Sequence, residues 1–90
     1  MKIGHSIVEY DNNTDRVVGD LLFVPEDYME EVKKIAGVDA DDPDAIYCYK
    51  LTVTEVLQIS QIVTAVGKSI LLTPESSYFL ECYQIEEEDN

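Results

Sequence analysis

Hydrophobic and polar positions follow a strand-like pattern in the first quarter of the chain. Residues 3–10 are rich in β-branched and aromatic side chains, and an apolar run resumes over residues 16–24. Between them, residues 11–15 are all Asp, Asn or Thr. Asn and Asp tolerate left-handed backbone and hydrogen-bond their own main chain, so such a cluster favours a turn. We therefore expect a β-hairpin with a loop of about four or five residues.

The next pattern has helical spacing. Pro25 ends the second strand, and the apolar positions of residues 28–36 fall on one helix face. Acids in the first turns and lysines in the last suit the helix dipole. Asp27 with Glu30 fits a capping box, or alternatively Pro25 is the first helical residue. Gly37 fits the position just past the end of the helix.

A second helix is expected after residue 52. Thr52 and Glu55 fit a capping box, and the apolar pattern runs to about Val66, where Gly67 ends it. Its polar stripe is narrow, so we expect a mostly buried helix, packed on a sheet or partly on a partner chain.

Shorter elements complete the pattern. Residues 39–44 are expected to form a loop, residues 45–51 a strand, residues 70–73 a short strand and residues 78–85 the final strand. The order β-β-α-β-α-β-β predicts an α+β fold: a single domain over residues 1–85, with two helices on one face of a mostly antiparallel sheet of about four to five strands.

Charge adds a hypothesis about partners. Six bases face nineteen acids in 90 residues, so the net charge is −13. A large net charge favours solubility and attracts partners of opposite sign. Residues 26–31 are expected to serve a helix start and residues 86–90 to form a flexible acidic tail, but neither reason covers the loop at residues 39–44. The few bases form no stripe for phosphate contacts, so nucleic acid is not an expected direct ligand.

The sequence contains no constellation typical of an enzyme. His5, the one histidine, is expected on the first strand as a surface or hydrogen-bonded residue. There is no glycine-rich phosphate loop, and neither cysteine has an identifiable neighbouring base. We expect no catalytic residues and no cofactor. Cys48 and Cys82 are expected to be free, largely buried thiols, with a disulfide between neighbouring strands as the alternative.

The loop at residues 39–44 invites a calcium interpretation, because Asp at alternate positions is how an EF-hand loop begins. Two later positions break the motif: Asp44 stands where a glycine is required, and Lys50 stands where a bidentate glutamate is required. No metal site is therefore expected. Two interpretations remain, a solvated turn and a partner-binding loop.

A partner-binding surface needs aromatic anchors as well as charge, because exposed ion pairs contribute little. Tyrosines follow the acidic loop directly, and others lie on the final strand, although a strand tyrosine is also a common core residue. The candidate partner-binding residues are Asp39, Asp41, Asp42, Asp44, Tyr47, Tyr49, Glu81 and Tyr83.

Several short motifs carry a family resemblance. They are Asp41-Asp42-Pro43-Asp44, Tyr47-Cys48-Tyr49, Leu51-Thr52 at a helix start, and Tyr78-Phe79-Leu80-Glu81-Cys82. With the opening hairpin, they resemble small acidic immunity proteins of bacterial polymorphic toxin systems, including contact-dependent growth inhibition. Residues 70–73 depart from the resemblance, since they are apolar where a more acidic strand is expected.

The resemblance implies a cytoplasmic protein without catalysis, whose partner is the C-terminal domain of a cognate toxin, often a basic nuclease. Binding would block the toxin's active site or an essential surface. The alternative is an interaction module of unrelated role or a homodimer, formed through the second helix or an exposed strand edge. No apolar run is long enough for a membrane helix, so no membrane association is expected.

Overall fold

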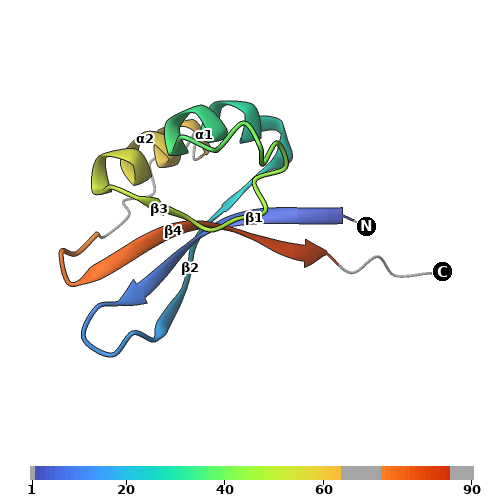
Figure 1. Cartoon of the computed structure of the whole chain (residues 1–90). Coiled ribbons are helices and arrows are strands. Elements are labelled where there is room, and N and C mark those ends of the chain that lie inside the picture. The colour runs from blue at the N-terminus through green and yellow to red at the C-terminus, as the bar shows by residue number, and fades with distance from the viewer. Residues whose placement is uncertain (1, 64–71, 86–90) are drawn as a thin grey trace.

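Two helices cover one face of a four-stranded antiparallel sheet in the computed structural model, which describes residues 2–63 and 72–85 (Figure 1). The strand order is β2-β1-β4-β3. The elements in chain order are β1 (Lys2–Asp11), β2 (Val17–Val24), the 3₁₀ turn η1 (Glu26–Tyr28), α1 (Met29–Ala36), β3 (Tyr49–Leu51), α2 (Val53–Val63) and β4 (Ser76–Ile85). The predicted α+β architecture is thereby confirmed.

Two expected strands differ from the structure. Leu72 and Thr73 belong to no strand, and the rest of the predicted strand at 70–73 lies outside the described residues. The strand predicted for residues 45–51 is reduced to β3 at 49–51. Its beginning is lost because Ala45 has a left-handed backbone, with φ of 51°, and turns the chain out of the sheet.

The opening hairpin forms where the sequence predicts it. Asp11 closes the turn, since its Oδ1 accepts a hydrogen bond of 2.8 Å from the N–H of Asn13. Asp15 adopts left-handed backbone, with φ of 56°. These are the two properties for which Asp and Asn are favoured in turns.

The ends of α1 confirm one expectation and correct another. Gly37 ends the helix in the left-handed conformation, with φ of 68°, and the N–H of Val38 donates to the Lys33 carbonyl at 3.0 Å. At the other end, Pro25 is extended and precedes η1, and no side chain caps either η1 or α1. The 3₁₀ turn therefore replaces both predicted helix starts.

The start of α2 is the predicted capping box. The N–H of Thr52 donates to Glu55 Oε1 at 2.8 Å, and the N–H of Glu55 donates to Thr52 Oγ1 at 3.1 Å. The predicted end at Val66 and Gly67 lies outside the described residues. No helix of the described part of the chain is long and apolar enough to cross a membrane.

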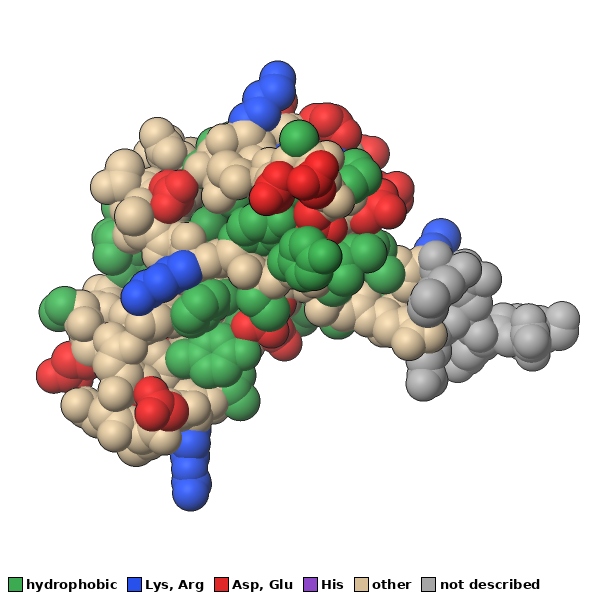
Figure 2. Space-filling view, viewed as in Figure 1, with side chains coloured by type: hydrophobic (Ala, Val, Ile, Leu, Met, Phe, Trp, Pro, Cys, Tyr) green, Lys and Arg blue, Asp and Glu red, His purple; other side chains and the backbone are tan. Residues whose placement is uncertain are grey.

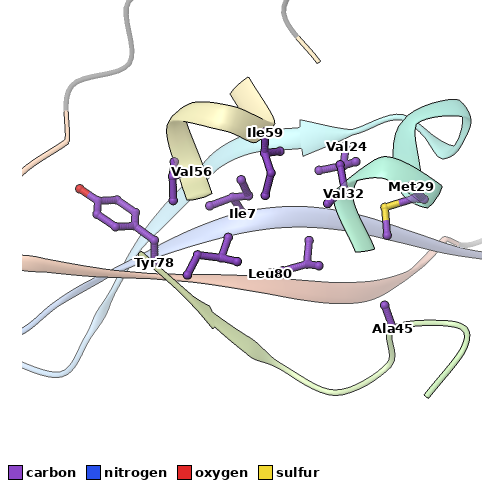
Figure 3. Packing of buried hydrophobic residues seen from close by; sticks show 10 residues of the cluster. Ile7, Val24, Met29, Val32, Ala45, Val56, Ile59, Tyr78 and Leu80 are labelled. Carbon is purple, nitrogen blue, oxygen red and sulfur yellow. The ribbon is translucent and has the colours of Figure 1, made fainter. Parts of the chain in front are cut away.

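The core lies between the sheet and the two helices (Figure 3). Ile7 of β1 and Leu80 of β4 pair across the sheet and are fully buried. On the helix side of the core, α1 contributes Val32, and α2 contributes Val56 and Ile59, all with 0% exposure. Only one side of α2 is buried in this way, since Val53 and Leu57 remain 46% and 44% exposed.

The opposite face of the sheet carries no helix among the described residues (Figure 1). Side chains alternate between the two faces along a strand. Because Ile7 and Leu80 face the helices, their neighbours Val8 and Phe79, which also pair, face the other way. The fold therefore offers a second, uncovered surface.

Candidate functional site

The connection between α1 and β3 is organised around one buried carboxylate. Asp42 is only 4% exposed. Its Oδ1 accepts from the N–H of Ile46 at 2.9 Å, and its Oδ2 accepts from the N–H of Tyr47 at 2.9 Å. Oδ2 also accepts from the hydroxyl of Tyr49 at 2.7 Å. Asp42 thus fixes the backbone of residues 39–47, which we call the acidic loop.

The charge of Asp42 is sustained by these donors. Burial opposes ionisation, but the hydrogen bonds from Ile46, Tyr47 and Tyr49, aided by nearby His5, hold the pKa of Asp42 below its ordinary 3.8. Burial and the bond to Asp42 raise the pKa of Tyr49, so this phenol remains a donor. At neutral pH the anchor is therefore an ionised acceptor with its donors in place.

His5 ties the acidic loop to the sheet. The ring is 6% exposed on β1, and its Nε2 lies 3.1 Å from the carbonyl oxygens of both Asp44 and Ala45. Both neighbours are acceptors, so Nε2 carries the proton and donates. His5 is a hydrogen-bonded structural residue, one of the two roles expected for it.

The outward side of the acidic loop combines charge with apolar area. Asp39, Asp41 and Asp44 are exposed. Ile46 and Tyr47 are 55% and 66% exposed. Figure 2 shows acidic side chains gathered over α1 and the loop after it, with hydrophobic side chains below them across the middle of the molecule. The loop therefore displays carboxylates and two large apolar groups on a fixed backbone.

The predicted site residues fall into two groups. Asp39, Asp41, Asp42, Asp44, Tyr47 and Tyr49 belong to the acidic loop or its exit into β3. Within this group Asp42 and Tyr49 turn inward, and they hold the loop's conformation. Glu81 and Tyr83 lie instead on β4, at positions that face the uncovered side of the sheet. The structure thus places the expected contacts on two surfaces.

The uncovered sheet face carries paired aromatic rings. Tyr10 and Phe79 meet edge to face with ring centroids 5.3 Å apart, and Phe23 and Tyr83 do so at 6.1 Å. The hydroxyl of Tyr10 donates to Glu81 Oε2 at 2.5 Å. We call these five residues the aromatic face. Together they give this side of the sheet aromatic surface and a carboxylate, with Phe23 59% and Tyr83 40% exposed.

Gly4 makes room for one of these rings. A Cβ at residue 4 would stand 2.5 Å from Cζ of Tyr83, so the ring lies directly over the glycine. An aromatic ring laid on a strand glycine covers exposed backbone. Gly4 therefore sets the position of Tyr83 on this face.

Three members of the aromatic face were not predicted from the sequence: Tyr10, Phe23 and Phe79. Alternation along the final strand does place Phe79, Glu81 and Tyr83 on one side, so a signal was present. What alternation cannot tell is which side the helices cover.

Both cysteines are free, as expected, but their burial differs from the prediction. Cys48 is exposed, because the chain around it leaves the sheet, and Cys82 is half-buried with Sγ 3.2 Å from the carbonyl oxygen of Ile46. Partial burial, Glu81 and Cys82 raise the pKa of the Cys48 thiol. In the described part of the chain no group of three or more His, Cys, Asp or Glu side chains is arranged to hold a metal ion.

A family model described as a domain of unknown function, DUF7683, matches residues 5–81. The chain belongs to this family. No curated protein and no solved structure matches the chain. The DUF7683 segment begins at His5 and ends at Glu81, so it contains the whole acidic loop and most of the aromatic face.

Proposed function

We propose that this DUF7683 protein is a cytoplasmic immunity protein that binds the C-terminal domain of a cognate bacterial toxin, a basic nuclease. Binding occludes a functional surface of the toxin and requires neither catalysis nor a cofactor. The observation that carries the proposal is the acidic loop, with its carboxylates and Tyr47 displayed on a backbone that Asp42 and His5 fix from inside.

Preorganisation is the first support. A mobile loop loses conformational freedom when it binds, and that loss weakens the complex. In the acidic loop, Asp42 and His5 already hold backbone groups through hydrogen bonds of 2.9 to 3.1 Å, and Asp42 also accepts from the Tyr49 hydroxyl at 2.7 Å. The exposed groups are therefore presented with little further ordering to undergo.

Charge is the second support. Among the described residues, the one ion pair joins Lys33 and Glu30 at 3.5 Å. The other described carboxylates have no described cationic side chain within ion-pair distance, in a chain of net charge −13. Such a surface accelerates encounter with a basic protein, and Ile46 and Tyr47 supply the apolar contact that slows dissociation.

A co-expression experiment tests the proposal. The toxin domain encoded beside this gene is produced with or without this protein, and cell survival and complex formation are measured. We expect rescue and a complex. Exchanging Asp39, Asp41 and Asp44 together for Asn should slow association about tenfold at low salt and flatten its salt dependence.

A matched control removes the same charge elsewhere: Glu26, Glu31 and Glu75 are exchanged together for Gln. This control variant should lower the association rate much less than the acidic-loop variant does. Equal effects of the two triple variants would remove the acidic loop from the interface, and failure to bind or protect would overturn the immunity function.

One observation favours a second candidate function, a homodimeric interaction module. Val53 and Leu57 stand one helical turn apart on α2 and are nearly half exposed. Static light scattering separates the candidates: a stable dimer that dissociates in Leu57→Gln supports the module, and a monomer at high concentration contradicts it.

A further inference from the structure

A hollow of about 360 Å³ opens beside the uncovered face of the sheet. Its lining comes from β1, the hairpin turn, the approach to β3, and β4. The residues that matter for its chemistry are Tyr10, Asp11, Asp15, Cys48, Phe79 and Glu81. We call it the Glu81 pocket. It is separate from the outward side of the acidic loop.

The lining of the Glu81 pocket combines apolar walls with negative charge. Tyr10 and Phe79 form an edge-to-face ring pair. Glu81 uses one oxygen to accept from Tyr10, and within the described residues it forms no ion pair. Asp11 and Asp15 add two further carboxylates to the lining, and no base is among the described lining residues.

The negative charge of Glu81 contributes to the raised pKa of two neighbouring groups, Tyr10 and Cys48. The hydrogen bond to Glu81, with burial, raises the pKa of Tyr10 to about 12. The Glu81 carboxylate also contributes to the raised pKa of Cys48. Lys50 partly offsets this negative charge. It stands opposite Phe79 in the strand register and brings one positive charge to this face.

We propose that the Glu81 pocket receives an arginine side chain of a basic protein partner. A guanidinium is flat, always charged and weakly hydrated, so it stacks on aromatic rings and pairs with carboxylates at the same time. The inference rests on the proposed function for the identity of the partner, and it adds a second, chemically specific contact to that of the acidic loop.

The pocket is tested without the partner, using N-acetyl-L-arginine amide as the probe. Amide NMR spectra of the ¹⁵N-labelled protein are recorded during a titration. We expect saturable shifts at residues lining the pocket, with a dissociation constant on the order of millimolar. The citrulline analogue is nearly isosteric but uncharged, and it should give no saturable shift.

Variants then assign the contact. Glu81→Gln keeps an acceptor for the Tyr10 hydroxyl but removes the charge, and we expect affinity for the arginine amide to fall about tenfold. Phe79→Leu keeps an apolar residue and removes the ring, so it should also weaken binding. Glu31→Gln, which removes an equal charge from α1, is the matched control and should leave affinity unchanged.

The outcomes separate this inference from the proposed function. An absence of saturable shifts, or equal affinity in Glu81→Gln and the unaltered chain, overturns the pocket even if the acidic-loop variants still slow toxin binding. Saturable binding that Glu81→Gln weakens, in a protein that fails to protect against the toxin, supports the pocket and overturns the immunity function.

Discussion

At the scale of single residues, neighbouring acids have opposite roles. Asp41 and Asp42 are adjacent and chemically identical, yet Asp41 is exposed and Asp42 is buried with three donors on its oxygens. The difference arises from the left-handed turn at Ala45, which brings the N–H groups of Ile46 and Tyr47 back onto the carboxylate. An acidic run read alone gives no indication of this, because the donors come from later residues.

The depressed pKa of Asp42 predicts a pH signature for Asp42→Asn. A lowered folded-state pKa stabilises the fold above the unfolded pKa of about 4, and this stability is lost as the pH falls through the folded value. The variant should therefore unfold at lower urea concentration at neutral pH, with a difference that is constant above about pH 5 and shrinks below about pH 4.

Urea unfolding curves between pH 3 and 7 provide the measurement, with Asp41→Asn as the control. Because Asp41 is exposed, Asp41→Asn should change the urea concentration of half-unfolding little at any pH. A difference between Asp42→Asn and the unaltered chain that does not vary with pH would contradict the ionised anchor.

At the scale of elements, predictions succeeded where the signal is local. The capping box of α2 and the Gly37 end of α1 depend on residues within one turn of each other, and both formed as expected. The strand at 45–51 was wrong in length because the left-handed backbone at Ala45, held by Asp42 just before it and by His5 on β1, sets its path. Element type was thus encoded locally, whereas element bounds and the aromatic face depended on tertiary contacts.

Removing the cap of α2 tests the local contribution. Thr52→Ala leaves the N–H of Glu55 without its acceptor, and we expect a loss of about 1 kcal/mol in unfolding free energy. For a domain of this size, the melting temperature should fall by about 4 to 8 °C. Thermal unfolding followed by circular dichroism is the measurement, and Thr54→Ala, an exposed change within the same first turn, is the control that should cause no comparable loss.

At the scale of the whole molecule, the charge that favours a basic partner acts against the fold. A net charge of −13 repels itself within one small domain, and the described residues hold a single ion pair to offset it. The same repulsion disfavours close association of two copies. The stability of the fold and the choice of partner therefore both depend on the net charge.

Salt should stabilise this protein. Raising NaCl from about 0.01 M to about 1 M shortens the Debye length from roughly 30 to 3 Å, so the self-repulsion is screened and the melting temperature should rise. Thermal unfolding at pH 7 provides the measurement. Near the isoelectric point of about 4.1, the same step should have much less effect. Equal shifts at both pH values would mean that the salt effect does not arise from net charge.

The internal anchoring of the acidic loop also bears on how such a protein can change its partner. Asp42, His5 and Tyr49 shape the loop from within, and Asp39 Oδ1 adds a hydrogen bond of 3.1 Å from the N–H of Asp41. The exposed side chains of Asp41, Asp44, Ile46 and Tyr47 take no part in this anchoring. Outward positions can therefore be replaced in combination while the anchor is retained. The outward positions therefore form an exchangeable recognition surface, and a library randomised at those four positions would sample new specificities on an unaltered scaffold.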